Sequence, residues 1–426
     1  MLILIIFIVM VALIMLNTPI AVALAVAAVF GLLATEGPSS LVTVALDMYD
    51  GSTKFSLIAI PMFVLAGAIM NAGGITDRLI NFVSALIGFV RGGLAMVNIG
   101  VSLFFAEISG SAVADVAALG SVLIPQMKKR GYSAPFSAAV TSSSASLAII
   151  IPPSIPMIVY GTSANASIEE LFVAGVVPGL LGAAGLMFVA YMFALRYNLP
   201  TEEAFNTKRL RETFVDALPA FALPVIILGG IFGGFVTATE AAGLAVLAAI
   251  VVGLWYREFS LSQLRRGMLD GGMQTAVVML LVAASVLMGG FLTRAQYPQD
   301  FAQWLLGVTD SQWTILLILN VFFLVIGFFL HSVAAIILVV PIVIPLITAA
   351  EIDPVHFGLI VTLNLAIGQQ TPPVASVLIT SCAVARANIW EVSKVNVYFV
   401  AVLLAVLMLC TYVPAVPMFL VEYFYR

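Results

Sequence analysis

Long apolar segments follow one another along almost the whole chain, and only short polar stretches separate them. They fall at 2–16, 20–35, 55–72, 94–106, 113–127, 134–151, 154–163, 171–195, 217–235, 239–256, 270–292, 313–328, 333–349, 355–367, 374–385 and 395–421. A helix that crosses a membrane needs about 20 apolar residues, so the longer segments predict spanning helices. Several others are too short to cross alone. The pattern therefore predicts an all-α polytopic membrane protein with interrupted spans.

The interruptions recur at a fixed distance along the chain. Three pairs of prolines are separated by one and the same interval: Pro125 and Pro345, Pro152 and Pro372, and Pro153 and Pro373. Proline lacks the backbone donor and clashes with the preceding turn, so it breaks or bends a helix. Short, proline-interrupted segments in corresponding positions of two halves are typical of secondary transporters. We therefore expect two inverted repeats; the alternative is that the prolines coincide by chance.

The sidedness of the chain follows if one crossing, 171–195, joins the two inverted repeats. Each repeat then contains spanning helices, arms, a re-entrant hairpin and a broken helix. The total is about ten crossings plus the hairpins, with both termini on the outer side of the membrane. This arrangement places 14 of the 17 basic residues in the cytoplasm: Arg78, Arg91, Lys128, Lys129, Arg130, Arg196, Lys208, Arg209, Arg211, Arg257, Arg265, Arg266, Arg386 and Lys394. Lys54, Arg294 and Arg426 remain outside, and the positive-inside rule predicts such a bias.

Two stretches of the chain are predicted to enter the membrane and return to the same side. Residues 94–127 have basic residues beyond both ends, so both ends are cytoplasmic. Residues 313–349 lie between polar stretches that the same arrangement places outside, so they enter from the opposite face. The stretches 77–90 and 298–310 fit arm helices that lie along the membrane surface.

The composition of the chain excludes several classes of protein. Hydrophobic residues make up 62% and charged residues 9%, whereas a soluble domain is about a quarter charged. Cys382 and Cys410 lie in apolar stretches, so we expect small buried side chains and no disulfide or metal cluster. The N-terminal segment has no basic region or cleavage site and is interpreted as a spanning helix. No nucleophile–base pair or Gly-rich phosphate loop is present, so we expect neither an enzyme nor a nucleic-acid partner.

Four interruptions are expected to meet near the middle of the membrane. They are two hairpin tips, 107–115 and 327–334, and two helix breaks, 148–154 and 368–373. Non-helical backbone survives at membrane depth only where it is buried in protein or lines a cavity. The alternative is that the breaks are kinks healed by neighbouring helices and water.

The four interruptions offer neutral oxygen ligands. The last carbonyls of each incoming half-helix lack partners and form the negative end of its dipole, which suits a cation. Ser109, Ser111 and Thr371 add hydroxyl oxygens. Calcium and magnesium sites recruit carboxylates, so sodium is the cation that we expect here.

The outgoing half-helices begin at "PPS" and "TPP" and present positive N-termini that suit an anionic substrate group. Polar candidates for substrate binding stand nearby: Ser142, Ser144, Asn364, Gln369 and Gln370. Small polar side chains can equally hold helices together, and that alternative stays open.

Ionisable residues within membrane segments are functional candidates because their burial is costly. We expect Asp115 to support the first tip, with a proton path as the alternative. Glu240 follows the "TAT" interruption and is expected to cap a helix start, where a carboxylate is favoured. His331 stands in the second tip, where packing or a supporting hydrogen bond is a simpler role than that of a base.

Several motifs are similar to the large membrane subunit of TRAP transporters (tripartite ATP-independent periplasmic transporters). They are "SGSAVADVAALGSVLIPQMKKRGY", "PPSIPMIVYG", "SIEELFVAGVVPG", "TATEAAGLAV" and "IDPVHFGLIVTLNLAIGQQTPPV". The similarity covers essentially the whole chain. The "LHS" tip together with "GQQTPPVASVL" resembles the sialic-acid branch more than the dicarboxylate branch of the family.

The resemblance implies a sodium-driven importer of organic acids in the bacterial inner membrane. Its partners would be a periplasmic substrate-binding protein and a small four-helix membrane subunit. The implied fold is that of the ion-transporter superfamily, in which a transport domain moves like an elevator. Six regions are implied: scaffold and arms 1–92, transport domain 93–170, linking helix and arm 171–216, second scaffold and arms 217–312, second transport part 313–390, and C-terminal helix 391–426.

The resemblance also implies two sodium sites. The first maps onto Ser109, Ser111, Ala148, Ile151 and Pro153, and the interval between the paired prolines places the second at Phe329, His331, Gly368, Thr371 and Pro373. The chain departs from the family at two positions. Many members carry Met-Asp where this chain has Leu330-His331, and Gly where it has Ala148.

Two other functions stay open at this point. One is a self-sufficient sodium–dicarboxylate symporter on the same fold, which would need no binding protein. The other is a membrane enzyme or redox subunit, which the lack of a catalytic or cofactor cluster disfavours.

Overall fold

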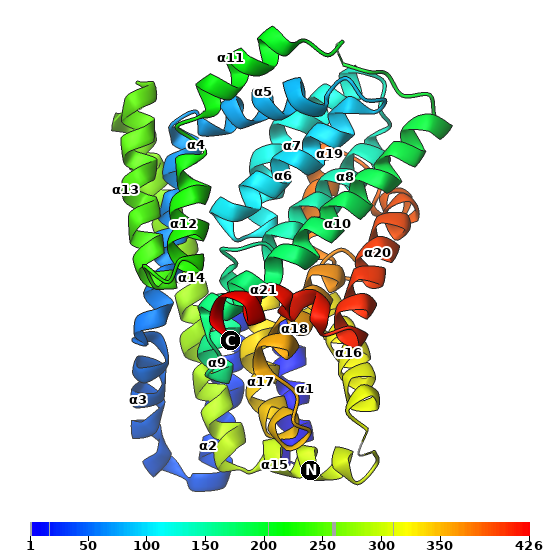
Figure 1. Ribbon diagram of the computed structural model, residues 1–426. Helices are drawn as coiled ribbons and strands as arrows, with labels where there is room; N and C mark the ends of the chain where they lie inside the picture. Colours follow the sequence, from blue (N-terminus) through cyan, green and yellow to red (C-terminus); the bar gives the residue numbers. More distant parts are fainter. Residues whose placement is uncertain (1, 17, 203, 258–260, 310) are drawn as a thin grey trace.

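The computed structural model describes residues 2–16, 18–202, 204–257, 261–309 and 311–426. Every regular element in this part of the chain is a helix, so the expected all-α class is confirmed (Figure 1). Of these helices, seven are long and apolar enough to cross a membrane, or up to eight if one bent pair counts as a single span. The protein is therefore a polytopic membrane protein.

The first half of the chain carries ten helices and three short 3-10 turns within the described residues. They are α1 (Leu2–Met15), α2 (Ile20–Glu36), η1 (Pro38–Ser40), α3 (Leu41–Ser52), η2 (Phe55–Ile58), α4 (Ala59–Ala72), α5 (Ile75–Ile87), α6 (Gly93–Ser109), α7 (Ala112–Lys129), α8 (Ala134–Ala145), η3 (Ser146–Ile149), α9 (Ile155–Ala164) and α10 (Ile168–Arg196).

The second half carries the remaining helices. They are α11 (Thr207–Ala217), α12 (Ala222–Phe232), α13 (Ala238–Tyr256), α14 (Leu261–Arg294), α15 (Tyr297–Leu306), α16 (Gln312–Phe329), α17 (Ser332–Ala349), α18 (Pro354–Gly368), α19 (Ser376–Ala385), α20 (Ile389–Tyr412) and α21 (Ala415–Tyr425).

The helices of the two halves correspond in position along the chain. The interval that separates the paired prolines also separates both ends of α7 from those of α17, the end of α6 from that of α16, and the start of α8 from that of α18. The peptide bonds Pro152-Pro153 and Pro372-Pro373 are both cis. In Figure 1 the pair α6–α7 lies in the upper half of the molecule and the pair α16–α17 in the lower half.

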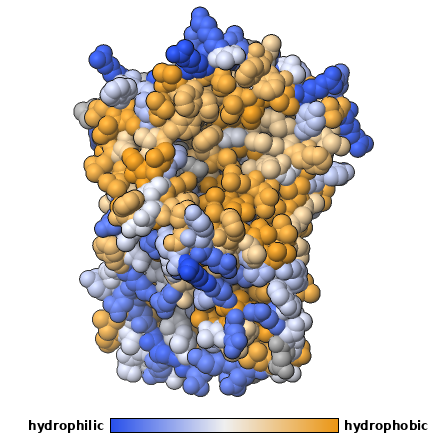
Figure 2. Space-filling model, viewed as in Figure 1, coloured by the Kyte–Doolittle hydropathy of each residue, from blue (hydrophilic) through white to orange (hydrophobic). Residues whose placement is uncertain are grey.

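Two groups of helices lie beside each other in Figure 1. Helices α2, α3, α4, α12, α13 and α14 form the left-hand column, with α9 against it, and α6 to α8, α10 and α16 to α20 form the larger group on the right. Small residues let the helices of the larger group pack closely. Ala138, Ala139, Ala366 and Ala148 are fully buried among them. The viewed face carries a broad apolar band, with hydrophilic side chains gathered at the top and over much of the lower part (Figure 2).

The ion pairs between distant segments agree with the side of the membrane on which the sequence places each segment. Among segments placed in the cytoplasm, Arg78 pairs with Asp216 at 3.4 Å and Arg130 with Glu202 at 3.2 Å. The pairs among segments placed outside are Arg294 with Asp47 and with Glu36, and Arg426 with Asp353 and with Glu170. Each of these pairs therefore joins residues that the sequence places on the same side.

The C-terminal region differs from the sequence prediction. The stretch 391–426 was expected to form one helix, but it contains α20 and α21 with a break between them. Pro414 lies at the break, and Val413 before it leaves the helical region at φ −126° and ψ 78°. Proline cannot continue a helix and disfavours helical backbone in the residue before it, so the chain turns here. The Tyr425 hydroxyl then donates to the Ile231 carbonyl at 2.8 Å and fastens α21 to α12.

Candidate functional site

The first hairpin tip turns through a glycine. Helix α6 ends at Ser109, Gly110 takes a left-handed conformation at φ 56°, and Ser111 caps α7 with an extended backbone. A Cβ atom at Gly110 would lie 2.8 Å from the Pro153 carbonyl oxygen. Only glycine combines this backbone conformation with so close an approach. The first tip therefore rests directly on the first break.

The first break separates α8 from α9 inside the protein. Helix α8 passes into the 3-10 turn η3, which ends at Ile149, and α9 begins at Ile155. Ser154 closes the gap, because its hydroxyl donates to the Ile149 carbonyl at 2.7 Å and accepts from the Met157 amide at 3.4 Å. The side chain of Ser154 is completely buried. Backbone groups on both sides of the break are therefore hydrogen-bonded by the capping residue Ser154.

The second tip and break meet by a different contact. The tip turns through Leu330 and His331, which both have extended backbones. One turn earlier, Gly327 of α16 faces Gly368 of α18, and a Cβ atom at Gly368 would lie 2.5 Å from the Gly327 Cα atom. The Val374 amide also donates to the Phe328 carbonyl at 3.2 Å. The backbones of the second hairpin and second break are therefore in direct contact.

One small cavity joins all four interruptions. Its volume is about 40 Å³, enough for one or a few water-sized groups. The lining residues from the interruptions are Gly110 and Ser111, Ile149 and Ile155, His331 and Ser332, and Gln369. Val278 from the long helix α14 completes one wall, although nothing in its sequence context marks it. Of the residues predicted for ions or substrate, Ser111, His331 and Gln369 share this cavity.

The other predicted sodium ligands lie around these contacts. Ala148, Ile151 and Pro153 belong to the buried first break. Ser109 is the last residue of α6, and its side chain lies outside the described part of the chain.

In the second half, the predicted ligands include both buried and exposed residues. Gly368 lies at the glycine contact, and the Thr371 hydroxyl donates to the Ile367 carbonyl at 3.1 Å. Pro373 is exposed within the second break, and the Phe329 side chain is 47% exposed.

Two of the substrate candidates hold helices together. Ser144 accepts from the Ser102 hydroxyl at 2.9 Å and donates to the Asn98 side-chain oxygen at 3.2 Å, which joins α8 to α6. The side chain of Asn364 donates to Asn320 at 2.6 Å, which joins α18 to α16. Both residues are completely buried. The helix-packing role that the sequence left open therefore applies to Ser144 and Asn364.

Four of the five substrate candidates keep unused polar atoms. Within the described residues, the Ser142 hydroxyl, the Asn364 side-chain oxygen, the Gln369 amide nitrogen and both side-chain polar atoms of Gln370 are buried without a hydrogen-bond partner. The Gln369 oxygen accepts from the Ser376 hydroxyl at 3.2 Å, which orients the amide. Buried polar groups are nearly always paired in folded proteins, so these atoms offer capacity for a ligand or for water.

The two carboxylates for which the sequence predicts supporting roles have different surroundings. Asp115 is 1% exposed in the first turn of α7, where its amide donates to the Ser111 carbonyl at 3.0 Å. Glu240 caps α13, as its position in the sequence suggested. Its carboxylate accepts from the Thr237 amide at 2.9 Å, and its own amide donates to the Thr237 hydroxyl at 3.3 Å. This capping box fixes the start of α13 and does not involve the cavity.

The chain is similar to a family of transport proteins. A sequence model described as the DctM component of the tripartite ATP-independent periplasmic transporter matches residues 7–416. The isethionate TRAP transporter permease DctMQ of Oleidesulfovibrio alaskensis is 41% identical over 405 residues. That match covers 95% of this chain but only 64% of the relative.

Two further relatives match over similar shares of both chains. The C4-dicarboxylate TRAP transporter large permease DctM of Pseudomonas aeruginosa is 38% identical over 380 residues, 89% of each chain. The sialic acid TRAP transporter large permease SiaM of Vibrio cholerae is 38% identical over 335 residues, 78% of each chain.

The fold is also similar to a solved transporter structure. The crystal structure of the YdaH transporter of Alcanivorax borkumensis superposes with a TM-score of 0.63 and covers 89% of each chain. Only 14% of the aligned residues are identical, so the likeness concerns the fold alone.

Proposed function

The chain belongs to the DctM component family of the tripartite ATP-independent periplasmic transporters, and from this premise we propose that it imports an organic acid together with sodium ions. Its relatives are transporter permeases and not enzymes. Like them, it is an integral protein of the inner membrane.

The observation that carries the sodium proposal is the cavity shared by the two tips and the two breaks. Its polar lining comes from Ser111, His331, Ser332 and Gln369, and none of the described lining residues is a carboxylate. Neutral oxygen donors suit a hard monovalent cation better than a divalent one. A volume of about 40 Å³ is also consistent with an ion and one or two waters.

The proposed ion sites use the predicted residues of each half. The first site comprises Ser109, Ser111, Ala148, Ile151 and Pro153, and the second comprises Phe329, His331, Gly368, Thr371 and Pro373. The direct contacts of each tip with its own break support this grouping, because ligands for one ion must stand within a few ångströms of one another.

We propose that regions 93–170 and 313–390 move together against the rest of the chain. The equal spacing of α7 and α17, and of the ends of α6 and α16, supports two inverted repeats. The grouping of the ion pairs supports the proposed sidedness, with both termini periplasmic. Rigid movement of one domain past the other would carry the ions and the acid across the membrane in an elevator mechanism.

The proposed substrate is an organic acid delivered by a periplasmic binding protein, and the sequence favours sialic acid. The relatives' names include a sulfonate, a dicarboxylate and a sialic acid, so the substrate needs a direct test. A small four-helix membrane subunit is the second proposed partner. The relative DctMQ is longer than this chain, which is consistent with a companion segment joined to it there.

Uptake by proteoliposomes tests the proposal. The chain is reconstituted with its small subunit and binding protein, and uptake of labelled N-acetylneuraminate, isethionate and succinate is measured. We expect uptake of one acid only when sodium is higher outside than inside. Equal uptake with a potassium gradient would contradict sodium coupling. Uptake without the binding protein would instead indicate a self-sufficient symporter.

A further inference from the structure

Lys54 differs from the other two basic residues that the sequence places outside the membrane. Arg294 pairs with Asp47 and Glu36, and Arg426 pairs with two carboxylates of its own. No carboxylate of the described residues lies within 4.0 Å of the Lys54 ammonium group. The ammonium instead donates to the Thr162 carbonyl at 3.2 Å. Lys54 is therefore the outer cation that remains available to an anion.

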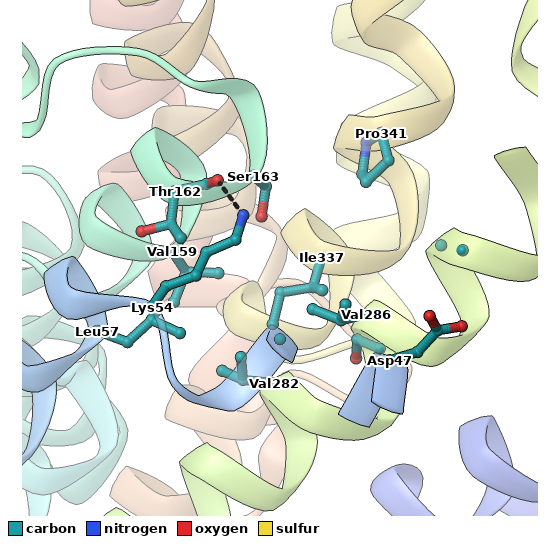
Figure 3. A pocket seen from close by; sticks show the side chains of 14 residues that line it. Asp47, Lys54, Leu57, Val159, Thr162, Ser163, Val282, Val286, Ile337 and Pro341 are labelled. Carbon is teal, nitrogen blue, oxygen red and sulfur yellow. Dashed lines mark hydrogen bonds between the residues drawn. The ribbon is translucent and has the colours of Figure 1, made fainter. Parts of the chain in front are cut away.

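Lys54 lines a cavity of about 200 Å³ between five elements (Figure 3). It stands between α3 and η2, and the cavity is completed by α9, α14 and α17. Ser163 and Ser285 add hydroxyl groups to a lining that is otherwise largely apolar. A dry cavity of about 150 Å³ can hold benzene, so this one has room for a small organic molecule or for the head group of a larger one.

The two ends of the cavity carry different charges. Figure 3 shows the Lys54 side chain directed toward Thr162 and Ser163, whereas Asp47 lies on the other side of the cavity. Asp47 shares Arg294 with Glu36, so two carboxylates face one guanidinium there. That end favours a hydroxyl or an amine, and it disfavours a second anionic group by like-charge repulsion.

We propose that this cavity captures the anionic head group of the transported acid, with Lys54 as its counter-ion. This inference rests on the proposed function and names the residue that recognises the substrate on the outer side. A carboxylate or sulfonate monoanion fits the charge pattern, whereas a dicarboxylate dianion does not. Charge-assisted hydrogen bonds to an anion are stronger than the bond to the neutral Thr162 carbonyl, so the anion displaces that bond.

The displaced bond links substrate binding to movement. Lys54 belongs to the segment between α3 and α4, while Thr162 lies in the last turn of α9, within the proposed moving region. In the absence of an anion, the Lys54 ammonium group stays bound to the Thr162 carbonyl, at the C-terminal and negative end of the α9 dipole. Binding of the acid to Lys54 would release α9 from that contact.

The first test separates capture from movement by uptake kinetics. We expect Lys54→Gln to raise the acid concentration for half-maximal uptake about tenfold or more, with the maximal rate changed by less than about twofold. Lys54→Arg should keep half-maximal uptake within about threefold, because the charge remains. Lys129→Gln removes a lysine on the opposite side and should have no effect. A fall in the maximal rate with an unchanged half-maximal concentration would overturn capture. It would indicate that Lys54 acts only through its contact with α9.

The second test does not depend on transport. Isothermal titration of the purified full chain with N-acetylneuraminate and with succinate measures binding directly. We expect N-acetylneuraminate to bind more tightly than succinate, and Lys54→Gln to weaken N-acetylneuraminate about tenfold. Equal binding by the wild type and Lys54→Gln, or tighter binding of succinate, would overturn the inference. If reconstituted wild type shows no sodium-driven uptake, the proposed function fails while this titration still decides the role of Lys54.

Discussion

The two hairpin tips reach the same place in the molecule by different means. The first turns through Gly110 in a left-handed conformation and touches the Pro153 carbonyl. The second turns through Leu330 and His331 in extended conformations, and its close contact lies one turn back, at Gly327. The first tip therefore depends on a bare backbone at the turn itself. The second can carry large side chains at the turn because its close contact is made by Gly327, within α16.

The largest effect is expected from Gly110→Ala. The new side chain strains a left-handed residue by about 1–2 kcal/mol and also collides with the Pro153 carbonyl. Together these terms should lower sodium-driven uptake about 100-fold, which corresponds to about 2.8 kcal/mol. Uptake assays with equal amounts of folded protein measure the loss.

Gly131→Ala is the matched control for that substitution. Gly131 also has a positive φ, of 88°, but nothing lies within 4 Å of a Cβ atom there. It carries the strain without the collision, so its uptake should stay within about threefold of the wild type. Equal losses in the two variants would mean that strain alone, and not the contact of tip and break, is decisive.

A smaller effect is expected at the glycine contact of the second half. Gly368→Ala places a Cβ atom 2.5 Å from the Gly327 Cα atom, so α16 and α18 must separate. Helices can shift slightly, and we expect uptake to fall about tenfold. Gly243→Ala in α13 meets nothing within 4 Å and should leave uptake unchanged. A larger loss for Gly368→Ala than for Gly110→Ala would reverse the comparison of the two tips.

We expect the Ser111 hydroxyl of the first half to contribute more to sodium binding than the Thr371 hydroxyl of the second half. Ser111 lines the shared cavity, whereas the Thr371 hydroxyl donates to the Ile367 carbonyl. We expect Ser111→Ala to raise the sodium concentration for half-maximal uptake about tenfold and Thr371→Ala about threefold. Sodium titrations of uptake at a saturating acid concentration give both values. Equal shifts would indicate that the two ion sites are equivalent.

The smallest effect should come from a pair remote from both tips. Burial alone raises the pKa of Asp353, but the Arg426 guanidinium and the His356 and Val355 amides bring the net pKa below its ordinary value. A carboxyl group with a lowered pKa stabilises the fold at pH values above its unfolded pKa of about 3.9, and this contribution is lost as pH falls through the folded pKa.

Arg426→Gln removes one of these partners. We expect a cost of about 0–1 kcal/mol at pH 7, and a smaller difference from the wild type once pH falls below about 4. Thermal unfolding at several pH values measures it, and half-maximal sodium should not change. A shift in half-maximal sodium would mean that this outer pair is coupled to the ion sites.

Much of the architecture could be predicted because repetition leaves a trace in the sequence. The spacing of Pro152 and Pro372 correctly located two breaks, since proline acts on its own backbone wherever it stands. The same reasoning applied to Pro414 would have divided the C-terminal helix. The apolar segment 395–421 is long enough for one continuous spanning helix, so the break was not predicted.

The contacts of the site could be predicted less well. Nothing local identifies Gly327 and Gly368 as partners, because their contact depends on how α16 and α18 cross. Ser144 and Asn364 are candidates for substrate binding, and their side chains also hold helices together. Polar residue type alone does not separate the two roles, since both need a buried hydrogen-bonding group.

The central claim, that the interruptions form sodium sites, is tested most directly by the thermal stability of the purified full chain. A ligand that binds only the folded state stabilises it in proportion to the logarithm of its concentration above its Kd. We predict that sodium chloride raises the midpoint of unfolding in proportion to the logarithm of its concentration, that potassium chloride at equal ionic strength does not, and that Gly110→Ala reduces the difference. Equal stabilisation by both salts, or a sodium response unchanged in Gly110→Ala, would contradict the account.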